Sequence, residues 1–367
     1  MNGSQETEVR NALKSARTIV VKVGSRSLAA RPDLPALLAQ QFASLKSEGR
    51  NIVLISSGAV ALGIERLGYS ERPSDIGQIR AAASAGQSLL MHRYDNAFRS
   101  EGLISAQVLI THGDLSNRLR VNNTRDALAA LLDAGAIPII NQNDTVATND
   151  QSFNDNDELS AMVTPLVDAD ALVLLTDVNG VLSPQNERIS FLESPDDFVD
   201  LGSQDSVGSG GMSSKIDAAY KARRAGAAVV IASALDEGCL TRALSGADIG
   251  TCLPRLPNEL RARQHWIAYV LRPRGTIIVD RGAAKALKEH DGSLLPIGVV
   301  GLRGEFRRGD SVRIETISGD LLGHGLARTS ALETARAAGK KGSQLLNAMG
   351  GETDTIIIHR DDLVRNL

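Results

Sequence analysis

The chain has 367 residues, which is too long for one ordinary hydrophobic core, so we expect two domains. Its formal net charge of -3 gives no sign of a nucleic-acid or acidic-membrane partner, and 43% hydrophobic with 23% charged residues is typical of a soluble globular protein. Two cysteines, Cys239 and Cys252, are too few for a disulfide framework or a cysteine-built metal site.

The beginning of the sequence, MNGSQETEVR, is polar and lacks the apolar segment of a signal peptide. The sequence also has no run of about 18 apolar residues, which a transmembrane helix would need. We therefore expect a cytoplasmic protein with no membrane partner, and we interpret residues 1–16 as a polar N-terminal extension.

Residues 17–255 alternate short apolar runs with longer amphipathic segments. The apolar runs are continuous, which is typical of strands buried on both faces of a parallel sheet. We predict strands at 18–23, 51–56, 105–110, 137–141, 171–176 and 227–231, and helices at 35–47, 74–99, 122–133, 158–167 and 211–224. This alternation predicts an α/β fold, with a doubly wound, largely parallel sheet sandwiched by helices.

The pattern changes after residue 255. Residues 256–273 begin with a polar, proline-containing stretch, and we interpret them as a linker. Residues 274–367 contain shorter apolar runs separated by glycines, and we predict strands at 276–279, 298–302, 311–315 and 355–358. This spacing of short apolar runs predicts a small, mostly β domain over residues 274–367.

Two predicted strands end in turns that suit a phosphate or another anion. The first strand carries Lys22 and is followed by Gly24, so that an ammonium and backbone N–H groups could face a phosphate. The second is followed by Ser57 and Gly58 at the start of a helix. An edge lysine in solvent and an ordinary tight turn are the alternatives. In open α/β sheets, ligands bind at the carboxyl ends of the strands, where both turns fall.

A polar stretch follows the fourth predicted strand, from Asn141 to Asp144 and again from Asn154 to Asp157. Its amide and carboxylate groups suit the recognition of an amino acid's ammonium and carboxylate. A solvated loop with capping Asn and Asp residues is the alternative, and the sequence does not decide between them.

A glycine-rich segment, VGSGGMSSK, leads into the helix predicted after residue 211. Its glycines and Lys215 would form a phosphate cradle at a helix start, although the spacing matches neither the Walker A nor the dinucleotide motif. A flexible surface linker is the alternative. Thr176 and Asp177 end another strand and add a polar pair at the same edge of the sheet.

The remaining reactive residues give no support to two other kinds of site. The six histidines are dispersed along the sequence and form no zinc-binding cluster with the cysteines. No G-x-S-x-G motif occurs, so a serine hydrolase has no support either. We predict no metal site built from protein side chains.

Taken together, these segments resemble the amino acid kinase family. The matching pieces are VVKVGSRSL, VLISSGAVALG, AAASAGQ, NNTRDALAALLDAGAIPIINQND, DNDELSA, VLLTDVNG and VGSGGMSSK, in the family's order over residues 18 to 255. The C-terminal part, with SLLPIGV and IHRDD, resembles a PUA domain. The resemblance therefore covers nearly the whole chain, and the combination of motifs is much more specific than any one of them.

Within this family, the chain is most similar to the enzymes that use ATP to phosphorylate the γ-carboxylate of L-glutamate, the first step of proline biosynthesis. The resemblance implies that Lys22 contacts ATP phosphates, that Asp157 orients Lys22 and Lys215 as the catalytic lysines, and that glutamate is bound by Ser57, Asp144 and Asn156. The nucleotide-binding residues it implies are Lys22, Thr176, Asp177, Ser209, Gly210, Gly211, Met212, Ser213, Ser214 and Lys215.

The resemblance also implies partners: Mg2+ held mainly by ATP phosphates, proline as a feedback inhibitor at the glutamate site, and further copies of the chain in a homo-oligomer. Two positions depart from the family pattern. Gln142 replaces an acidic residue, which changes the charge around the substrate ammonium, and Ser25 replaces a threonine.

The chemistry agrees with this assignment. A glutamate γ-carboxylate has a pKa near 4.3 in water, so it is an ionised nucleophile at pH 7 and needs no general base. The reaction instead needs positive charge and in-line positioning at the transferred phosphoryl group, which two lysines and Mg2+ would supply.

Two alternatives remain. Other kinases of the same family act on acetylglutamate, aspartate, carbamate, UMP or isopentenyl phosphate, but the SSGAVA and DNDELSA segments favour glutamate. RNA binding by the C-terminal domain is the second alternative. Residues 274–367 contain 14 Lys and Arg against 12 Asp and Glu, a net of +2, so we favour a structural or regulatory role.

Overall fold

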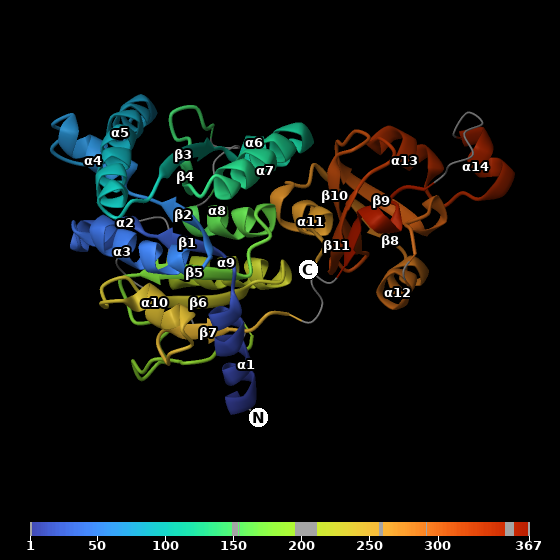
Figure 1. The fold of residues 1–367 in the computed structure, drawn as a ribbon. Coiled ribbons are helices and arrows are strands. Elements are labelled where there is room, and N and C mark those ends of the chain that lie inside the picture. The colour runs from blue at the N-terminus through green and yellow to red at the C-terminus, as the bar shows by residue number, and fades with distance from the viewer. Residues whose placement is uncertain are drawn as a thin grey trace. The chain divides into compact units, whose positions relative to one another are not determined.

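The computed structural model describes residues 2–148, 153, 155–194, 211–256, 260–290, 292–348 and 356–365. The chain divides into two compact units, Met1–Glu259 and Leu260–Leu367 (Figure 1). Among the described residues, no helix has both the length and the apolar character to cross a membrane.

The first unit is built on a sheet that has seven strands among the described residues, in the order β3-β4-β2-β1-β5-β6-β7. The strands are β1 (Thr18–Val23), β2 (Asn51–Ser56), β3 (Ser105–Ile110), β4 (Ile137–Gln142), β5 (Ala171–Thr176), β6 (Ala228–Ser233) and β7 (Thr251–Leu253). Neighbouring strands are parallel except β6 and β7, which are antiparallel. The predicted largely parallel α/β sheet is therefore confirmed.

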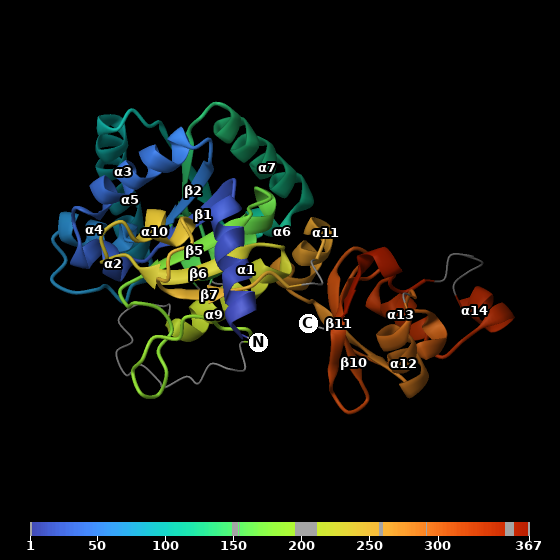
Figure 2. The same ribbon diagram turned by 60° about the horizontal axis from the view of Figure 1, so that its bottom comes forward.

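Helices cover both faces of this sheet (Figures 1 and 2). On one face lie α1 (Asn2–Ser15), α3 (Leu34–Ser47), α5 (Ile76–Ser100) and α10 (Cys239–Leu244). The helices α8 (Asn156–Val163) and α9 (Met212–Arg224) pack against the strands from the other face, and α7 (Arg118–Asp133) packs against β4. Each fully buried Val, Leu or Ile in these layers contributes about 1.5–3 kcal/mol to the free energy of unfolding.

The alternation of β1 decides which side chains face the site. Ile19, Val21 and Val23 belong to the core beneath α1, α3, α5 and α10. Successive side chains of a strand point to opposite faces, so Lys22 lies on the face covered by α8 and α9. A lysine can therefore lie in a buried strand, because Asp157 of α8 pairs with it on that face.

Short helices begin directly after three of the strands: α2 (Ser25–Ala30), α4 (Ala59–Arg66) and α6 (His112–Ser116). The helix α4 lies very close to α5, and two glycines allow this approach. A Cβ atom added at Gly63 would lie 1.7 Å from the carbonyl oxygen of Ala82, and one added at Gly86 would lie 1.7 Å from that of Ala59. A short 3-10 helix, η1 (Thr164–Leu166), follows α8.

The sequence predicted a polar N-terminal extension over residues 1–16, and in the structure this segment forms α1 of the first unit. Val9 and Leu13 of α1 are 3% and 0% exposed and pack in the main core. Arg10 donates to Asp248 at 2.7 Å, which ties α1 to the loop before β7. Val9 and Leu13 are spaced i, i+4 and form a narrow apolar stripe in an otherwise polar segment.

The second unit contains a mostly antiparallel sheet in the order β12-β11-β10-β8-β9, in which only β8 and β10 pair in parallel. Its strands are β8 (Gly275–Val279), β9 (Val299–Gly304), β10 (Ser311–Thr316), β11 (Leu321–Leu326) and β12 (Leu363–Arg365). Its helices are α11 (Ala262–His265), α12 (Arg281–Glu289), α13 (Ala331–Ala337) and α14 (Gly342–Ala348), with short helices at Trp266–Val270 (η3), Pro296–Gly298 (η4) and Arg360–Asp362 (η5). The predicted small, mostly β domain is confirmed.

Several predicted features of this unit differ from the structure. Residues 260–271, predicted as linker, include α11 and the π-helical turn Trp266–Val270, where Ile267 is 0% exposed and packs with Val364. The predicted strand at 355–358 begins outside the described residues, and Ile358 forms only an isolated bridge with Leu294. The strands β11 and β12 were not predicted, because β11 contains Gly323 and Gly325 and β12 is three residues long.

Candidate functional site

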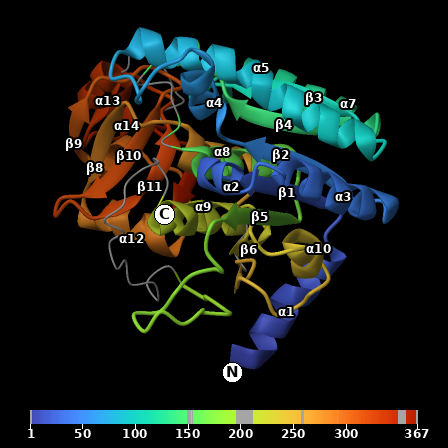
Figure 3. The same cartoon turned by 90° about the vertical axis from the view of Figure 1, so that its left-hand side faces the viewer.

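The carboxyl ends of β1, β2, β4 and β5 meet at one edge of the first sheet, because these strands are parallel neighbours. The residues that follow them line a cavity of about 390 Å³. Figure 3 shows α2, α8 and α9 gathered around the ends of β1 and β5. This is the place where doubly wound sheets bind their ligands.

A buried group of three charges lies in this cavity. Lys22 of β1 and Lys215 of α9 lie on either side of Asp157 in α8, with Nζ to carboxylate oxygen distances of 2.7 Å and 3.1 Å. Their exposed fractions are 5%, 4% and 0%. The structure thus brings together two lysines that are 193 positions apart in the sequence, as the resemblance implied.

Among the causes that shift the pKa of Lys22, burial has the largest effect. It lowers the pKa of the Lys22 ammonium, and the positive charge of Lys215 lowers it further, while Asp157 raises it. Since one carboxylate neutralises only one of two ammonium groups, the cluster with both lysines charged keeps a surplus positive charge in a water-poor environment. Such a cluster favours a polyanion such as a triphosphate.

Ser57 and Asn156 are joined by hydrogen bonds across the cavity wall. The Asn156 amide donates to Ser57 Oγ at 2.8 Å, to Asn141 Oδ1 at 2.9 Å and to the Ser56 carbonyl at 3.0 Å. Asn156 opens α8, and Asp155 caps this helix by accepting from the Glu158 N–H at 2.9 Å. The ends of β2 and β4 are thereby fixed to the start of α8.

Asp144 lines the same cavity and is held by Gln142. The Gln142 amide nitrogen donates to Asp144 Oδ1, and the Gln142 amide oxygen accepts from the Phe153 N–H at 2.7 Å. Burial raises the pKa of Asp144, whereas the Gln142 hydrogen bond and the charge of Arg72 act in the opposite direction. The amide of Gln142 therefore donates to Asp144 and accepts from Phe153 at the same time. A carboxylate at this position could accept from Phe153 but has no N–H to donate to Asp144.

The residues predicted to bind nucleotide are only partly described. Thr176 and Asp177 line the cavity, and the Thr176 hydroxyl donates to Asp177 at 3.0 Å. Gly211, Met212, Ser213 and Ser214 lie at the start of α9 without lining the cavity, and Ser214 donates to Asp155, which does line it. Ser209 and Gly210 lie outside the described residues.

The lining residues that sequence reasoning missed include Arg26, Arg72 and Phe153. Arg26 forms an ion pair with Asp177 at 3.7 Å, and Phe153 packs edge-on against His112 with ring centres 5.5 Å apart. Arg26 follows the first predicted turn and could have been proposed from that position. Arg72 lies in the connection between α4 and α5 and has no local motif that would mark it.

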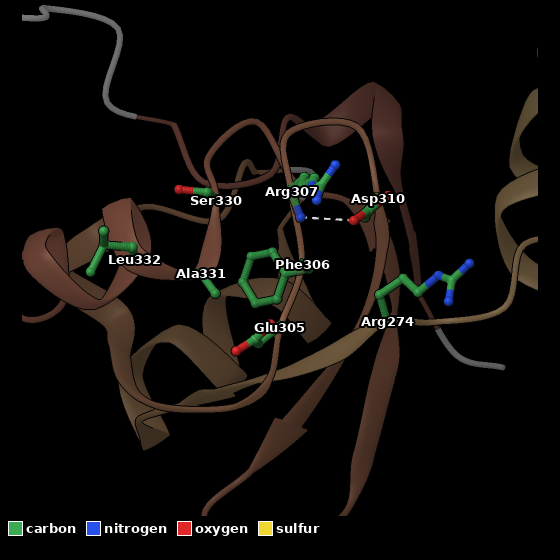
Figure 4. A pocket seen from close by; sticks show the side chains of 8 residues that line it. All are labelled: Arg274, Glu305, Phe306, Arg307, Asp310, Ser330, Ala331 and Leu332. Carbon is green, nitrogen blue, oxygen red and sulfur yellow. Dashed lines mark hydrogen bonds between the residues drawn. The ribbon is translucent and has the colours of Figure 1, made fainter.

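A second cavity of about 730 Å³ lies in the second unit (Figure 4). Its lining residues are Arg274, Glu305, Phe306, Arg307, Asp310, Ser330, Ala331 and Leu332. Figure 4 shows Asp310 bonded to the backbone of its own turn, where it accepts from the Arg307 N–H at 2.7 Å. Although this cavity is larger, none of the charged residues that line it, Arg274, Glu305, Arg307 and Asp310, is buried, whereas Lys22, Asp157 and Lys215 are. The chemistry therefore points to the first unit. Among the described residues, no group of His, Cys, Asp and Glu side chains is arranged to hold a metal ion.

Comparison with known proteins matches both units to known families. Residues 17–233 match the model of the amino acid kinase family, and residues 275–348 match the PUA domain. Similar proteins include the glutamate 5-kinase of Thermus thermophilus, 44% identical over 95% of this chain and 97% of the relative, and that of Trichlorobacter lovleyi, 42% identical over 97% and 98%. The glutamate 5-kinase of Marinomonas sp. is 40% identical over 97% of this chain and 99% of the relative.

A solved structure is similar in fold to part of this chain. The N-acetylglutamate synthase of Neisseria gonorrhoeae, in complex with coenzyme A and N-acetyl-glutamate, matches with a TM-score of 0.50 at 19% identity, over 69% of this chain and 63% of that one. A match of this kind concerns the fold alone. Motifs, cavity and near full-length relatives agree, and the chain belongs to the amino acid kinase family, with a PUA domain after the kinase domain.

Proposed function

We propose that this chain transfers the γ-phosphoryl group of ATP to the γ-carboxylate of L-glutamate, giving L-glutamyl 5-phosphate in the first step of proline biosynthesis. The observation that carries this proposal is the convergence of Lys22 and Lys215 on Asp157 in a cavity that Asp144 also lines. The near full-length relatives named glutamate 5-kinases support the choice of substrate.

The two lysines act on the phosphates. Their ammonium groups neutralise charge on the transferred phosphoryl group and on the leaving ADP, and Asp157 holds both in place. Thr176 and Asp177 bind the nucleotide from the end of β5, together with the start of α9. Because Asp157 is already shared by two ammonium groups, we expect Mg2+ to be held mainly by the ATP phosphates, where it supplies further neutralising charge.

Asp144, Ser57 and Asn156 act on the amino acid. The Asp144 carboxylate pairs with the substrate ammonium. The Ser57 hydroxyl and the Asn156 side-chain amide form hydrogen bonds with the rest of the substrate. A γ-carboxylate oxygen then forms a bond to the γ-phosphorus as the bond from that phosphorus to the β–γ bridging oxygen breaks. No proton needs to be removed, since the nucleophile is already ionised. Proline also has an ammonium and a carboxylate on one carbon, so we propose that it inhibits by occupying the glutamate site.

The test is a substrate panel with ATP, Mg2+ and hydroxylamine, which converts an acyl phosphate to a stable hydroxamate. We expect γ-glutamyl hydroxamate and ADP in equal amounts with L-glutamate. N-Acetyl-L-glutamate, L-aspartate, carbamate, UMP and isopentenyl phosphate should give neither product above background. Efficient turnover of one of these compounds, with none of glutamate, would assign the site to another kinase of the family.

A further inference from the structure

We propose that Arg72 binds the α-carboxylate of the amino acid substrate and thereby selects amino acids whose α-carboxylate is free. This inference rests on the proposed function and adds a specificity residue to it. Neither the motifs nor the spacing of charged residues in the sequence pointed to this side chain. Three features carry the inference: the position of Arg72 in the cavity, its charge, and the absence of any hydrogen bond or ion pair from Arg72 to the other described residues.

The position of Arg72 is fixed by the chain around it. It lies in the connection between α4 and α5 and lines the cavity with Asp144, Lys22 and Lys215. Pro73 follows it and restricts Arg72 to extended backbone conformations. The tight packing of α4 against α5 holds both ends of this connection. A long side chain is thus presented to the cavity from an anchored loop.

The other basic side chains of the cavity include three that are paired with acidic residues, whereas Arg72 can bind a substrate carboxylate. Among the residues that the structure describes, four basic and four acidic side chains line it: Lys22, Arg26, Arg72 and Lys215, with Asp144, Asp155, Asp157 and Asp177. Lys22 and Lys215 share Asp157, and Arg26 pairs with Asp177. Arg72 forms no hydrogen bond or ion pair with any other residue that the structure describes, and its side chain is exposed. Within the described part of the chain, it is therefore a cation at the cavity wall whose N–H donors make no hydrogen bond.

Arg72 and Asp144 together match the α-carbon end of an amino acid. This end carries an ammonium and a carboxylate on one carbon, and a site needs opposite charges side by side to bind both. Asp144 supplies the negative charge, and Arg72 lies close enough to influence its ionisation. The guanidinium of arginine suits a carboxylate because it offers two parallel N–H donors. With this end bound at Asp144 and Arg72, the γ-carboxylate is free to extend to the two lysines.

Arg72 could instead act only on Asp144, by keeping that carboxylate ionised. The two roles predict different outcomes with a modified substrate. The α-amide of L-glutamic acid keeps the ammonium and the γ-carboxylate but replaces the α-carboxylate with a neutral amide. An Arg72 that acts only through Asp144 would matter equally for both compounds, whereas an Arg72 that binds the α-carboxylate would matter only for glutamate.

The experiment measures kcat/KM of the full-length chain for L-glutamate and for its α-amide, in the wild type and in Arg72→Gln. We expect Arg72→Gln to lower kcat/KM for glutamate by roughly 10-fold or more, through KM, because a charged hydrogen bond is lost. At a pH well above the pKa of Asp144, where this carboxylate is ionised in both proteins, the value for the α-amide and the KM for ATP should stay unchanged. Arg72→Lys should recover part of the loss, since it keeps the charge without the paired donors.

Arg93→Gln is the matched control, because Arg93 is exposed on α5 and does not line the cavity. Equal losses with both substrates, or no loss with either, would overturn the role of Arg72 while leaving the proposed function intact. A wild-type chain that does not phosphorylate glutamate would overturn the proposed function and this inference with it. Thermal melting of each variant shows whether it is folded.

Discussion

At the scale of single residues, the site depends on one carboxylate that serves two lysines. Asp157 is fully buried, and its two oxygens contact Lys22 and Lys215 separately. Two ammonium groups this close would repel each other strongly in a water-poor site without the carboxylate between them. Asp157 therefore holds the two ammonium groups close together in the protein without bound nucleotide.

Lys215→Ala tests this arrangement. We expect kcat for glutamate phosphorylation to fall by roughly 100-fold or more, because the variant loses charge stabilisation of the transition state. The fold should survive, since Asp157 keeps Lys22 as a partner. Steady-state kinetics with a melting curve provide the measurement. Lys221→Ala on the same helix is the control, because Lys221 pairs with Asp217 at 2.8 Å and does not line the cavity. A folded Lys215→Ala variant with normal turnover would remove Lys215 from the mechanism.

The hydrogen bond from Gln142 counteracts the effect of burial on the pKa of Asp144, and Gln142→Glu tests this effect. Burial already raises the pKa of Asp144, so it takes up a proton at a higher pH than an ordinary aspartate. The ionised form binds the substrate ammonium in the proposed function, so kcat/KM for glutamate should fall as the pH decreases through this pKa. The variant removes an N–H donor to Asp144 and adds a like charge, and both changes raise this pKa further.

We therefore expect the acid limb of the pH profile of kcat/KM to move to higher pH in Gln142→Glu, with kcat at high pH nearly unchanged. Gln40→Glu, at an exposed position of α3, adds the same charge far from the cavity lining and serves as the control. Superimposable acid limbs for wild type and Gln142→Glu would show that Gln142 does not control Asp144.

The sequence identified most of the residues that meet in the cavity, for a physical reason. Lys22, Ser57, Asp144 and Thr176 directly follow or end apolar strands, and parallel strands bring such positions to one edge. Arg72 follows no strand, and only the packing of α4 on α5 places it there. Side chains that reach a site through tertiary packing leave no local signal in the sequence.

At the scale of elements, the buried strands were predictable and the short helices were not. The predicted bounds of β1, β2, β3 and β5 agree with the structure. In β1, β2 and β5, buried runs rich in Val, Ile and Leu leave little choice of boundary, whereas β3 is mostly half-buried. In contrast, α2 and α6 have six and five residues, which is too short for a helical period to show. The end of α8 was placed too late, because a 3-10 turn with Pro165 follows it.

The contact between α4 and α5 carries a prediction of its own. Gly63→Ala places a methyl group against the Ala82 carbonyl, and the helices must separate to accept it. We expect the free energy of unfolding to fall by about 1–3 kcal/mol or more. The KM for glutamate should also rise, because Ala59 and Val60 at the start of α4 line the cavity.

Thermal or urea unfolding measures the first effect, and steady-state kinetics measure the second. Gly3→Ala is the control, since an added Cβ atom there would meet no atom within 4 Å. Equal stability of Gly63→Ala and the wild type would show that the two helices tolerate a wider spacing.

At the scale of the whole molecule, all described residues that line the proposed site come from the first unit. The change of composition near residue 255 predicted two domains. The structure divides the chain at Glu259 and Leu260, and residues 260–271 pack in the second unit. Composition marks such a boundary only approximately, since the polar residues that precede α11 do not reveal the buried Ile267 and Val270 behind them.

The division predicts that residues 1–256 alone phosphorylate glutamate with a kcat close to that of the full chain. The measurement is the hydroxamate assay on the truncated protein, with circular dichroism to confirm that it is folded. A folded but inactive fragment would show that the second unit contributes to catalysis, and a changed KM with normal kcat would indicate a regulatory contribution.

The identity of the attacking atom is the most direct test of the proposed chemistry. L-Glutamate labelled with 18O in its γ-carboxylate is converted with ATP and Mg2+ in unlabelled water, and hydroxylamine then cleaves the acyl phosphate at its carbonyl carbon. The released phosphate keeps the oxygen that formed the new bond, and 31P NMR detects the isotope shift. We predict one 18O atom in each phosphate released as hydroxamate forms. Phosphate that contains no 18O would mean that water, and not the glutamate carboxylate, attacks ATP in this cavity.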